Sequence, residues 1–321
     1  MFSSDQYQLI DFGDGRRLER FGRLLLDRPC PAAEGFQRAD PQAWSAADAR
    51  FDRTAAEQGR WTSRGTLPQQ WTIAHGRLRL GLKRSGFGHL GVFPEQAANW
   101  DWIAEVLRPI APPGKTPARA EGGQSSQCKV LNLFAYTGGS TLAAAAAGAE
   151  VTHVDAARNT IARARRNAEL SGMSAAPIRW IAEDAGKFVR RELRRGNRYE
   201  VVILDPPSYG HGPRGEVWRL SKHLPRLLAD CGELTAGRCR FMILTCHTPG
   251  FDPQRLKEMI VQAKQGTDTT RAEPPSGRSD GSYLPPFSGG VLEAEQLTIR
   301  SAADRDLPSG VVVRWRQAAE K

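Results

Sequence analysis

Two short stretches of the chain carry side chains that could make or break bonds. In "ILTCHTPGF" (243–251), Cys246 follows a run of residues that suits a buried strand. In "LDPPSY" (204–209), Asp205 follows a second such run and precedes two prolines. A thiolate can add to an electrophilic carbon, and a carboxylate can accept hydrogen bonds from an amino group. Cys246 also has a plainer interpretation as a buried thiol that ends a strand.

Composition narrows the classes of protein to consider. The 321 residues carry a formal net charge of +10, which favours a polyanionic partner such as nucleic acid, although a solvated basic surface gives the same count. Five cysteines without a CxxC and six scattered histidines predict neither a disulfide framework nor a metal site. The N-terminus lacks a signal pattern and no run is long enough to cross a bilayer, so we expect a soluble, cytoplasmic protein without membrane contact.

The second part of the chain, 128–321, alternates strand and helix patterns and is expected to form one domain. Such alternation predicts parallel βαβ units, so the expected fold is α/β, with a doubly wound, mostly parallel, seven-stranded, Rossmann-like sheet. The predicted strands are 129–135, 151–155, 178–183, 199–205 and 241–245, with closing strands at 292–299 and 311–315. The predicted helices are 140–147, 159–170, 185–195, 217–230 (mostly) and 253–264.

The first part, 1–108, is expected to form a smaller β-rich domain that could dock RNA or another substrate. Hairpins are predicted where Gly13-Asp14-Gly15 and His75-Gly76 supply turns, with a helix over 100–107. Residues 31–60 have the composition of a loop with a short helix. Residues 109–127 are rich in Pro, Gly and Ser and predict a linker or long loop between the domains.

Polar and glycine residues follow the predicted strands at their carboxyl ends, where ligands bind in doubly wound sheets. The first strand is followed by Gly138-Gly139, the second ends in Asp155, the third in Glu183-Asp184 and the fourth in Asp205. Asp155 is placed to bind a ribose diol. The glycines match neither GxGxxG nor GxxxxGK[ST], which argues against a dinucleotide enzyme and a phosphate-cradling NTPase.

These residues carry a family resemblance. The stretch "VLNLFAYTGGSTLAAAAAGAEVTHVDAARNTIARARRNAELSGM" resembles the S-adenosylmethionine (SAM) region of class I methyltransferases. A narrower resemblance is to the bacterial large-subunit rRNA methyltransferases that act on cytosine C5. It rests on the FAYTGG loop, the acid that ends strand two, the A-x-x-N helix, the DPP motif and the later cysteine. "GHLGVFPEQ" (88–96) resembles the segment that precedes the SAM domain there, and the resemblance spans about residues 70–315.

The resemblance implies a SAM cofactor and a role for each matching residue. The methionine half of SAM would be wrapped by the loop residues Phe134, Tyr136, Thr137, Gly138 and Gly139. Asp155 would hold the ribose, Asp184 and Ala185 would meet the adenine, and Phe93 and Gln96 would close the methionine end. The chain departs from the family in two places: its start lacks a PUA-like pattern, and His247 stands where serine usually follows the cysteine.

Three functions remain open at this point. The first is an RNA methyltransferase, acting on rRNA or a ribosomal particle, that methylates cytosine C5 through a Cys246 adduct with help from Asp205. The second methylates a base nitrogen: Asp205 accepts from the amino group, Pro206 and Pro207 stiffen the turn, and Tyr209 stacks on the base. The third is a non-catalytic RNA-binding or ribosome-assembly protein. Candidate RNA-docking residues are Arg16, Arg17, Arg20, Arg23, Lys83 and Arg84.

Overall fold

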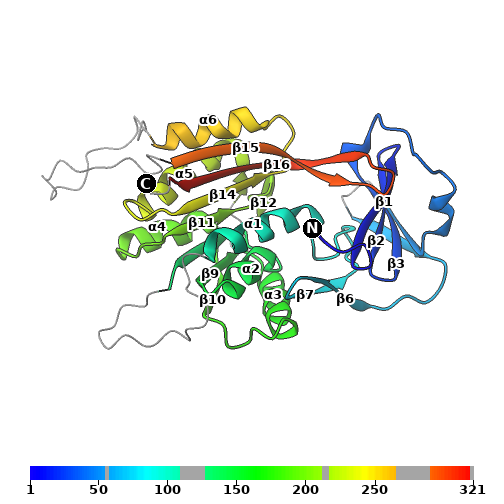
Figure 1. Cartoon of the computed structure of the whole chain (residues 1–321), viewed down its shortest axis with the longest axis horizontal. Coiled ribbons are helices and arrows are strands. Elements are labelled where there is room, and N and C mark those ends of the chain that lie inside the picture. Colours follow the sequence, from blue (N-terminus) through cyan, green and yellow to red (C-terminus); the bar gives the residue numbers. More distant parts are fainter. Residues whose placement is uncertain (55–57, 109–126, 212–216, 265–289, 319–321) are drawn as a thin grey trace, which may run out of the picture.

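A seven-stranded sheet with helices on both faces forms the larger part of the computed structural model, which describes residues 1–54, 58–108, 127–211, 217–264 and 290–318 (Figure 1). The linker predicted at 109–127 lies outside the described residues, apart from residue 127. The strand order in the sheet is β10-β9-β8-β11-β14-β16-β15. The parallel strands are β8 (Lys129–Leu133), β9 (Glu150–Asp155), β10 (Ile178–Ala182), β11 (Val201–Leu204) and β14 (Phe241–Cys246). β15 (Gly290–Arg300) and β16 (Asp306–Gln317) complete the sheet in the antiparallel sense, so the predicted fold class is confirmed.

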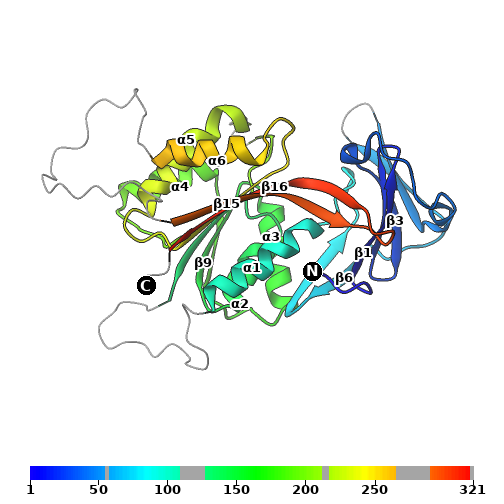
Figure 2. The same ribbon diagram turned by 45° about the horizontal axis from the view of Figure 1, so that its top comes forward.

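Helices cover both faces of this sheet (Figure 2). One face carries α1 (Ala97–Leu107), α2 (Gly139–Ala146) and α3 (Arg158–Leu170), and the other carries α4 (Ala185–Arg194), α5 (Leu220–Leu234) and α6 (Pro253–Lys264). Strands buried on both faces need apolar side chains at every position, which explains why "VVIL" of β11 is entirely buried. Alternate residues of β14 enter the two apolar cores, Phe241 and Ile243 on the α1 side and Met242 and Leu244 on the α5 side.

The N-terminal region forms a five-stranded sheet in which residues 31–60 differ from the prediction. Its strands are β1 (Tyr7–Gly13), β2 (Arg16–Phe21), β3 (Leu24–Pro29), β4 (Ala49–Arg53) and β5 (Gly59–Ser63), in that order. The expected loop and short helix are instead two 3-10 turns, Pro31–Ala33 and Ala43–Ala46, followed by β4 and β5. β5 is the edge strand, and β4 lies between it and β3. β4 buries only Ala49 and Phe51 and β5 buries no side chain fully, so neither strand gives a long apolar pattern in the sequence.

The predicted hairpin at His75-Gly76 is confirmed, but it forms a sheet of its own. β6 (Gln70–His75) pairs with β7 (Leu78–Lys83), and β7 packs on α3. The Gly81 N–H donates to Asn167 Oδ1 (2.8 Å), and the Arg79 N–H donates to Ser171 Oγ (2.9 Å). The hairpin therefore closes against the α3 side of the larger sheet.

A long hairpin joins the two main sheets. β15 and β16 run from the large sheet to the N-terminal sheet, as Figures 1 and 2 both show. At its tip, Leu9 bridges to Ser301 and its carbonyl accepts from the Ala302 N–H (2.8 Å). One apolar core runs without a break from the N-terminal sheet to one face of the large sheet. The domain boundary after residue 108 stays a prediction.

A second difference concerns residues 217–230, predicted as mostly helical. Val217–Arg219 form a short strand, β13, that pairs with β12 (Tyr209–His211), and α5 begins only at Leu220. The β-favouring Val217 and Trp218 find a partner strand directly after the DPP turn, so pairing replaces the first helical turn.

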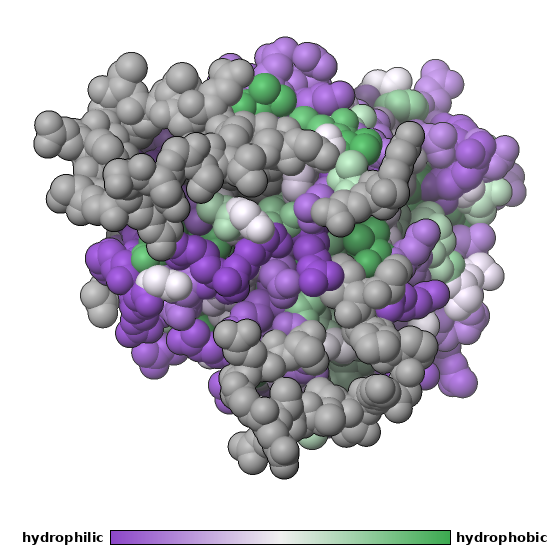
Figure 3. All heavy atoms as spheres, turned by 60° about the vertical axis from the view of Figure 1, so that its left-hand side comes forward, coloured by the Kyte–Doolittle hydropathy of each residue, from purple (hydrophilic) through white to green (hydrophobic). Residues whose placement is uncertain are grey.

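The end of the molecule away from the N-terminal sheet has a mainly polar described surface. Figure 3 shows hydrophilic side chains over much of it, with hydrophobic side chains in separate, smaller areas. No helix among the described residues has the length and apolar character needed to cross a bilayer.

The β15–β16 hairpin is anchored to the N-terminal sheet by Asp11. This residue is 1% exposed, and its carboxylate accepts hydrogen bonds from Arg305 Nη2 (2.6 Å) and Trp44 Nε1 (2.8 Å). We expect Asp11→Ala to lower the free energy of unfolding by about 3 kcal/mol, because it leaves a partly buried guanidinium unpaired. Urea denaturation measures this. The matched control is Asp304→Asn, which removes an ion pair with Arg300 from a side chain that is 84% exposed. Asparagine tolerates the left-handed backbone at this position (φ +59°), so the midpoint should hardly change. Equal midpoint shifts for the two variants would contradict the prediction.

Candidate functional site

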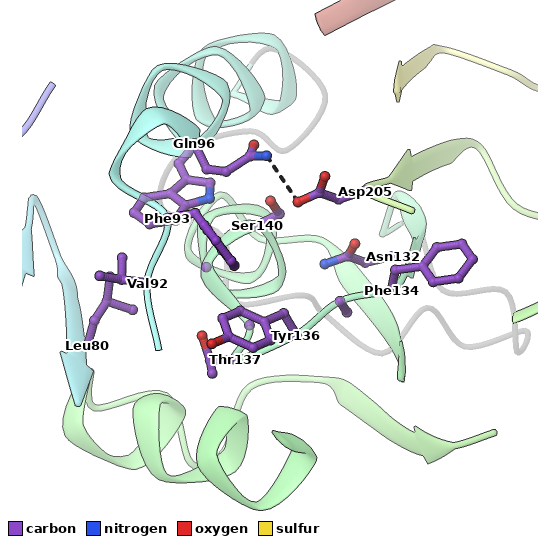
Figure 4. A pocket seen from close by; sticks show the side chains of 14 residues that line it. Leu80, Val92, Phe93, Gln96, Asn132, Phe134, Tyr136, Thr137, Ser140 and Asp205 are labelled. Carbon is purple, nitrogen blue, oxygen red and sulfur yellow. Dashed lines mark hydrogen bonds between the residues drawn. The ribbon is translucent and has the colours of Figure 1, made fainter. Parts of the chain in front are cut away.

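The strand order reverses between β8 and β11, and a cleft lies where their carboxyl ends meet. Leu133 and Leu204 are paired in register at the ends of these strands, so the loop after β8 and Asp205 after β11 emerge side by side. Such a switch point is where open α/β sheets bind ligands. Figure 4 shows the cleft, which spans about 430 Å³ with its solvent-open part included. It is lined by Leu80, Val92, Phe93, Gln96, Trp100, Asn132, Phe134, Ala135, Tyr136, Thr137, Gly138, Gly139, Ser140 and Asp205.

The loop after β8 has an unusual backbone. Phe134 (φ +56°) and Tyr136 (φ +48°) both adopt left-handed conformations, which cost roughly 1–2 kcal/mol for residues with a Cβ. Between them the Ala135 N–H donates to the Val154 carbonyl (3.0 Å), and the Tyr136 N–H donates to Asp155 Oδ2 (2.9 Å). Strained conformations persist where the surroundings fix them, and they cluster at functional sites.

Segments distant in the sequence hold the far end of this loop. Thr137 Oγ1 donates to the Gly91 carbonyl (2.7 Å), and Asn167 Nδ2 on α3 donates to the Thr137 carbonyl (2.9 Å). Because Gly91 belongs to the 88–96 stretch, that stretch and the loop form one side of the cleft.

The two glycines of the loop have different physical roles. Gly138 (φ +91°) is in the left-handed region, which suits glycine. At Gly139, a Cβ would lie 2.3 Å from Trp100 Cζ2. The start of α2 can therefore approach α1 closely only because position 139 has no side chain.

Asp205 is held in the cleft by two neighbours. Its carboxylate accepts from Gln96 Nε2 (3.1 Å) and from Thr245 Oγ1 at the end of β14. The Gln96 amide is itself oriented by Asn99, whose Nδ2 donates to Gln96 Oε1 (2.8 Å). A carboxylate positioned in this way can accept a further hydrogen bond from a ligand.

His247 lies beside Asp205 and a second acid. His247 Nε2 is 3.6 Å from Asp205 Oδ1, and Nδ1 is 4.0 Å from Glu95 Oε1. The rings of His247 and Phe93 are nearly parallel, with centroids 6.4 Å apart. Phe93 and Asp205 line the cleft, and His247 lies directly beside both of them.

Cys246 does not line the cleft. It is 1% exposed and belongs to the apolar core on the α5 side, with Val311 and Trp315. Thr245 and His247 face Asp205, so the pleat of β14 directs the intervening thiol to the other face. Burial raises the pKa of the Cys246 thiol, which disfavours the thiolate that covalent catalysis needs.

The remaining candidate cofactor residues lie along the next two strand ends. Each carboxylate oxygen of Asp155 accepts a backbone N–H, from Tyr136 and from Ala157 (both 2.9 Å), and burial raises the pKa of this acid. Asp184 caps α4 by accepting from the Lys187 N–H (2.8 Å), and Ala185 is buried at the start of that helix. Asp155 contacts the cleft-forming loop through Tyr136, but none of these three residues lines the cleft, and their contacts to a cofactor stay predictions.

The DPP turn is braced by β13. The Pro207 carbonyl accepts from Trp218 Nε1 (2.7 Å), and the Trp218 ring packs on Phe134 (4.9 Å between centroids). Pro206 is buried, whereas Pro207 is exposed and the Tyr209 side chain is 52% exposed. The Tyr209 side chain thus lies at the surface outside the cleft, and its stacking on a base stays a prediction.

Sequence reasoning missed several cleft residues, above all Trp100, Asn132, Ser140 and Thr245. Asn132 had a signal, since an amide inside an otherwise apolar strand must find a partner, and its Nδ2 donates to Thr141 Oγ1 (2.9 Å). Trp100 had none, because its contact with Gly139 joins segments that the sequence does not relate.

The residues present fit a SAM molecule. Three carboxylates lie at the carboxyl ends of the strands: Asp155 at the end of β9, Asp184 in the turn after β10 and Asp205 directly after β11. The loop after β8 adds backbone groups and two glycines at the switch point. This donor set suits a ribose, an amino-bearing ring and an amino-acid tail. Among the described residues, no group of His, Cys, Asp and Glu is arranged to hold a metal ion.

The fold and cleft define a class I methyltransferase, and comparisons agree. The model of S-adenosylmethionine-dependent methyltransferases matches residues 117–259. The crystal structure of a SAM-dependent methyltransferase from Agrobacterium tumefaciens is 34% identical, with a TM-score of 0.81, and the match covers 98% of this chain and 91% of that one. The chain belongs to the SAM-dependent methyltransferase family.

Curated relatives match over a shorter stretch. Ribosomal RNA large subunit methyltransferase I of Aeromonas hydrophila is 39% identical over 82 residues, and its Escherichia coli counterpart is 33% identical over 82 residues. Each alignment covers 25% of this chain and 21% of the relative. The chain thus aligns with about a fifth of the length of these relatives.

The close contact at Gly139 predicts the effect of adding a methyl group there. Because the new Cβ would clash with Trp100, Gly139→Ala must displace either Trp100 or the loop, and such overpacking costs about 1–3 kcal/mol. We therefore expect Gly139→Ala to weaken binding of S-adenosylhomocysteine, the demethylated product, at least about tenfold. Isothermal titration calorimetry measures the affinity, and circular dichroism checks the fold. Gly65→Ala is the control, since its added Cβ meets nothing within 4 Å. An unchanged affinity in a folded Gly139→Ala protein would show that this close approach does not shape the cofactor site.

Proposed function

We propose that this protein transfers a methyl group from SAM to a base of RNA, with ribosomal RNA as the substrate class. The observation that carries the proposal is Asp205, a carboxylate oriented by Gln96 and Thr245 in the cleft beside the β8 loop. The names of the curated relatives and the net charge of +10 support RNA as the acceptor.

The chain's own residues position both reactants. Phe134, Tyr136, Thr137, Gly138 and Gly139 would wrap the methionine half of SAM. Asp155 would hold its ribose, Asp184 and Ala185 its adenine, and Phe93 and Gln96 would close the methionine end. When bound, SAM supplies an electrophilic methyl group on its sulfonium sulfur.

The geometry favours an amino nitrogen as the acceptor. The Asp205 carboxylate would accept an N–H hydrogen bond from the amino group of the base, which raises electron density at the nitrogen and aims its lone pair. Pro206 and Pro207 hold the turn, and exposed Tyr209 offers a ring on which an unstacked base can lie. The amino group then loses one proton as the new N–C bond forms, and Asp205 or His247 is placed to receive it.

Cytosine C5 is the second candidate, supported by the family resemblance. There the Cys246 thiolate would add to C6, C5 would take the methyl group, and loss of the C5 proton would release the thiol. In this structure the thiol is buried on the opposite face of β14, and burial raises its pKa. The C5 route therefore requires the end of β14 to rearrange, whereas the nitrogen route uses side chains that already line the cleft.

At Asp205, we expect Asp205→Asn to lower methyl transfer to RNA by about 100-fold or more, because a neutral amide accepts a weaker hydrogen bond from the amino group and cannot take up its proton. The assay follows labelled methyl groups from SAM into total RNA of cells that lack the protein. Asp252→Asn, at the exposed start of α6, serves as the control and should keep full activity. Activity of Asp205→Asn close to wild type would contradict the assigned role.

The nitrogen route does not use the Cys246 thiol. We therefore expect Cys246→Ser to keep methyl transfer within about threefold of wild type. RNA that contains 5-fluorocytosine should give no covalent adduct with the wild-type protein. A stable adduct that Cys246→Ser abolishes would instead establish C5 methylation, and the absence of any transfer by wild type would favour the non-catalytic RNA-binding role.

A further inference from the structure

A second, larger hollow opens next to the cleft, between the N-terminal sheet and the end of β14. It spans about 1350 Å³ with its solvent-open part included. Arg17, Arg28 and Arg53 line it from the N-terminal sheet, Phe87 and Phe93 from the segment before α1, and His247 from the large sheet. Phe93 also lines the cleft, and His247 lies 3.6 Å from Asp205, so the two spaces adjoin.

Glu95 is the unusual residue in this hollow. Its side chain is 6% exposed, yet its Oε2 has no hydrogen-bond partner among the described residues. Its other oxygen lies 4.0 Å from His247 Nδ1, beyond hydrogen-bond length. A buried carboxylate oxygen without a partner is costly, and such an atom calls for an explanation such as a ligand.

The rest of the hollow has the features of a nucleotide site. The Phe87 side chain is 53% exposed, and an exposed ring can stack on an unpaired base. Arg53 is exposed on the same side and can meet a phosphate, whereas Arg17 and Arg28 are engaged with Glu19. An enzyme that methylates a base must first take that base out of its stack into such a pocket.

We propose that this hollow receives the RNA nucleotide that is methylated and that Glu95 binds the Watson–Crick edge of its base. The inference rests on the function proposed above and names its substrate more closely. With Glu95 at its Watson–Crick edge and its amino group toward Asp205, the base would lie along His247, whose ring nitrogens are 4.0 Å from Glu95 Oε1 and 3.6 Å from Asp205 Oδ1.

The two acids narrow the base. Asp205 needs an amino group as hydrogen-bond donor, which cytosine, adenine and guanine bear and uracil lacks. The substrate is therefore a base with an exocyclic amino group, and Glu95 meets its Watson–Crick edge. Burial raises the pKa of the Glu95 carboxyl, which favours its protonated form.

Kinetics of Glu95 variants test the inference. We expect Glu95→Ala to lower kcat/KM for methylation of the total RNA described above at least about tenfold, mainly through KM. Glu95→Gln should stay within about threefold of wild type, because an amide keeps one donor and one acceptor on this side. Glu258→Gln on the exposed face of α6 is the matched control. S-adenosylhomocysteine affinity, measured by calorimetry, should be equal in all variants, which separates base binding from a general structural defect.

Two results overturn the inference in distinguishable ways. If wild type methylates RNA and folded Glu95→Ala retains its kcat/KM, Glu95 does not bind the base, although the proposed function stands. If wild type transfers no methyl group to RNA, the proposed function fails and this inference fails with it.

A binding experiment on the wild-type protein tests the base without any variant. Fluorescence anisotropy should show that short oligocytidine or oligoadenosine binds at least about fivefold more tightly than oligouridine of the same length, since only the former bases bear the amino group. Equal affinity for all three would overturn the assignment of the base.

Discussion

The site depends on one backbone constraint: the chain leaving β8 must turn sharply enough to expose its loop at the switch point. Phe134 and Tyr136 achieve this by adopting left-handed conformations, and the Asp155 carboxylate holds the turn by accepting from the Tyr136 N–H. Asn167 and Gly91 fix the loop from two further segments. The strained conformation persists because hydrogen bonds with three separate parts of the fold stabilise the same loop conformation.

The connection between the two sheets bounds the second hollow, which adjoins the cleft at Phe93. The β15–β16 hairpin reaches the N-terminal sheet, where the Arg305–Asp11 pair fastens it, and one apolar core passes between the sheets. The hollow that contains Glu95 is bounded by this arrangement, because its walls come from both sheets and from the tip region of the hairpin. A substrate there would contact the N-terminal sheet while its reactive atom faces Asp205.

The sequence predicted the large sheet well because strands buried on both faces have distinctive apolar runs, as "VVIL" and "FMILTC" show. It predicted the β8 loop, Phe93, Gln96 and Asp205 through a resemblance and through the geometry of parallel strand ends, and these residues share one cleft. It did not reveal which face Cys246 takes, since one residue of register at the end of β14 decides this. It also missed β4 and β5, which together bury only Ala49 and Phe51, and Glu95, whose buried position and unpartnered Oε2 are seen only in the structure.

The central claim is that an acid in the switch-point cleft directs a methyl group to the amino nitrogen of an RNA base. Mass spectrometry of nucleosides from ribosomal RNA, isolated from cells with and without this protein, tests it most directly. The account predicts that cells without the protein lose a nucleoside methylated on the exocyclic amino group of its base. Unchanged nucleosides, or loss of a carbon-methylated cytidine instead, would contradict it.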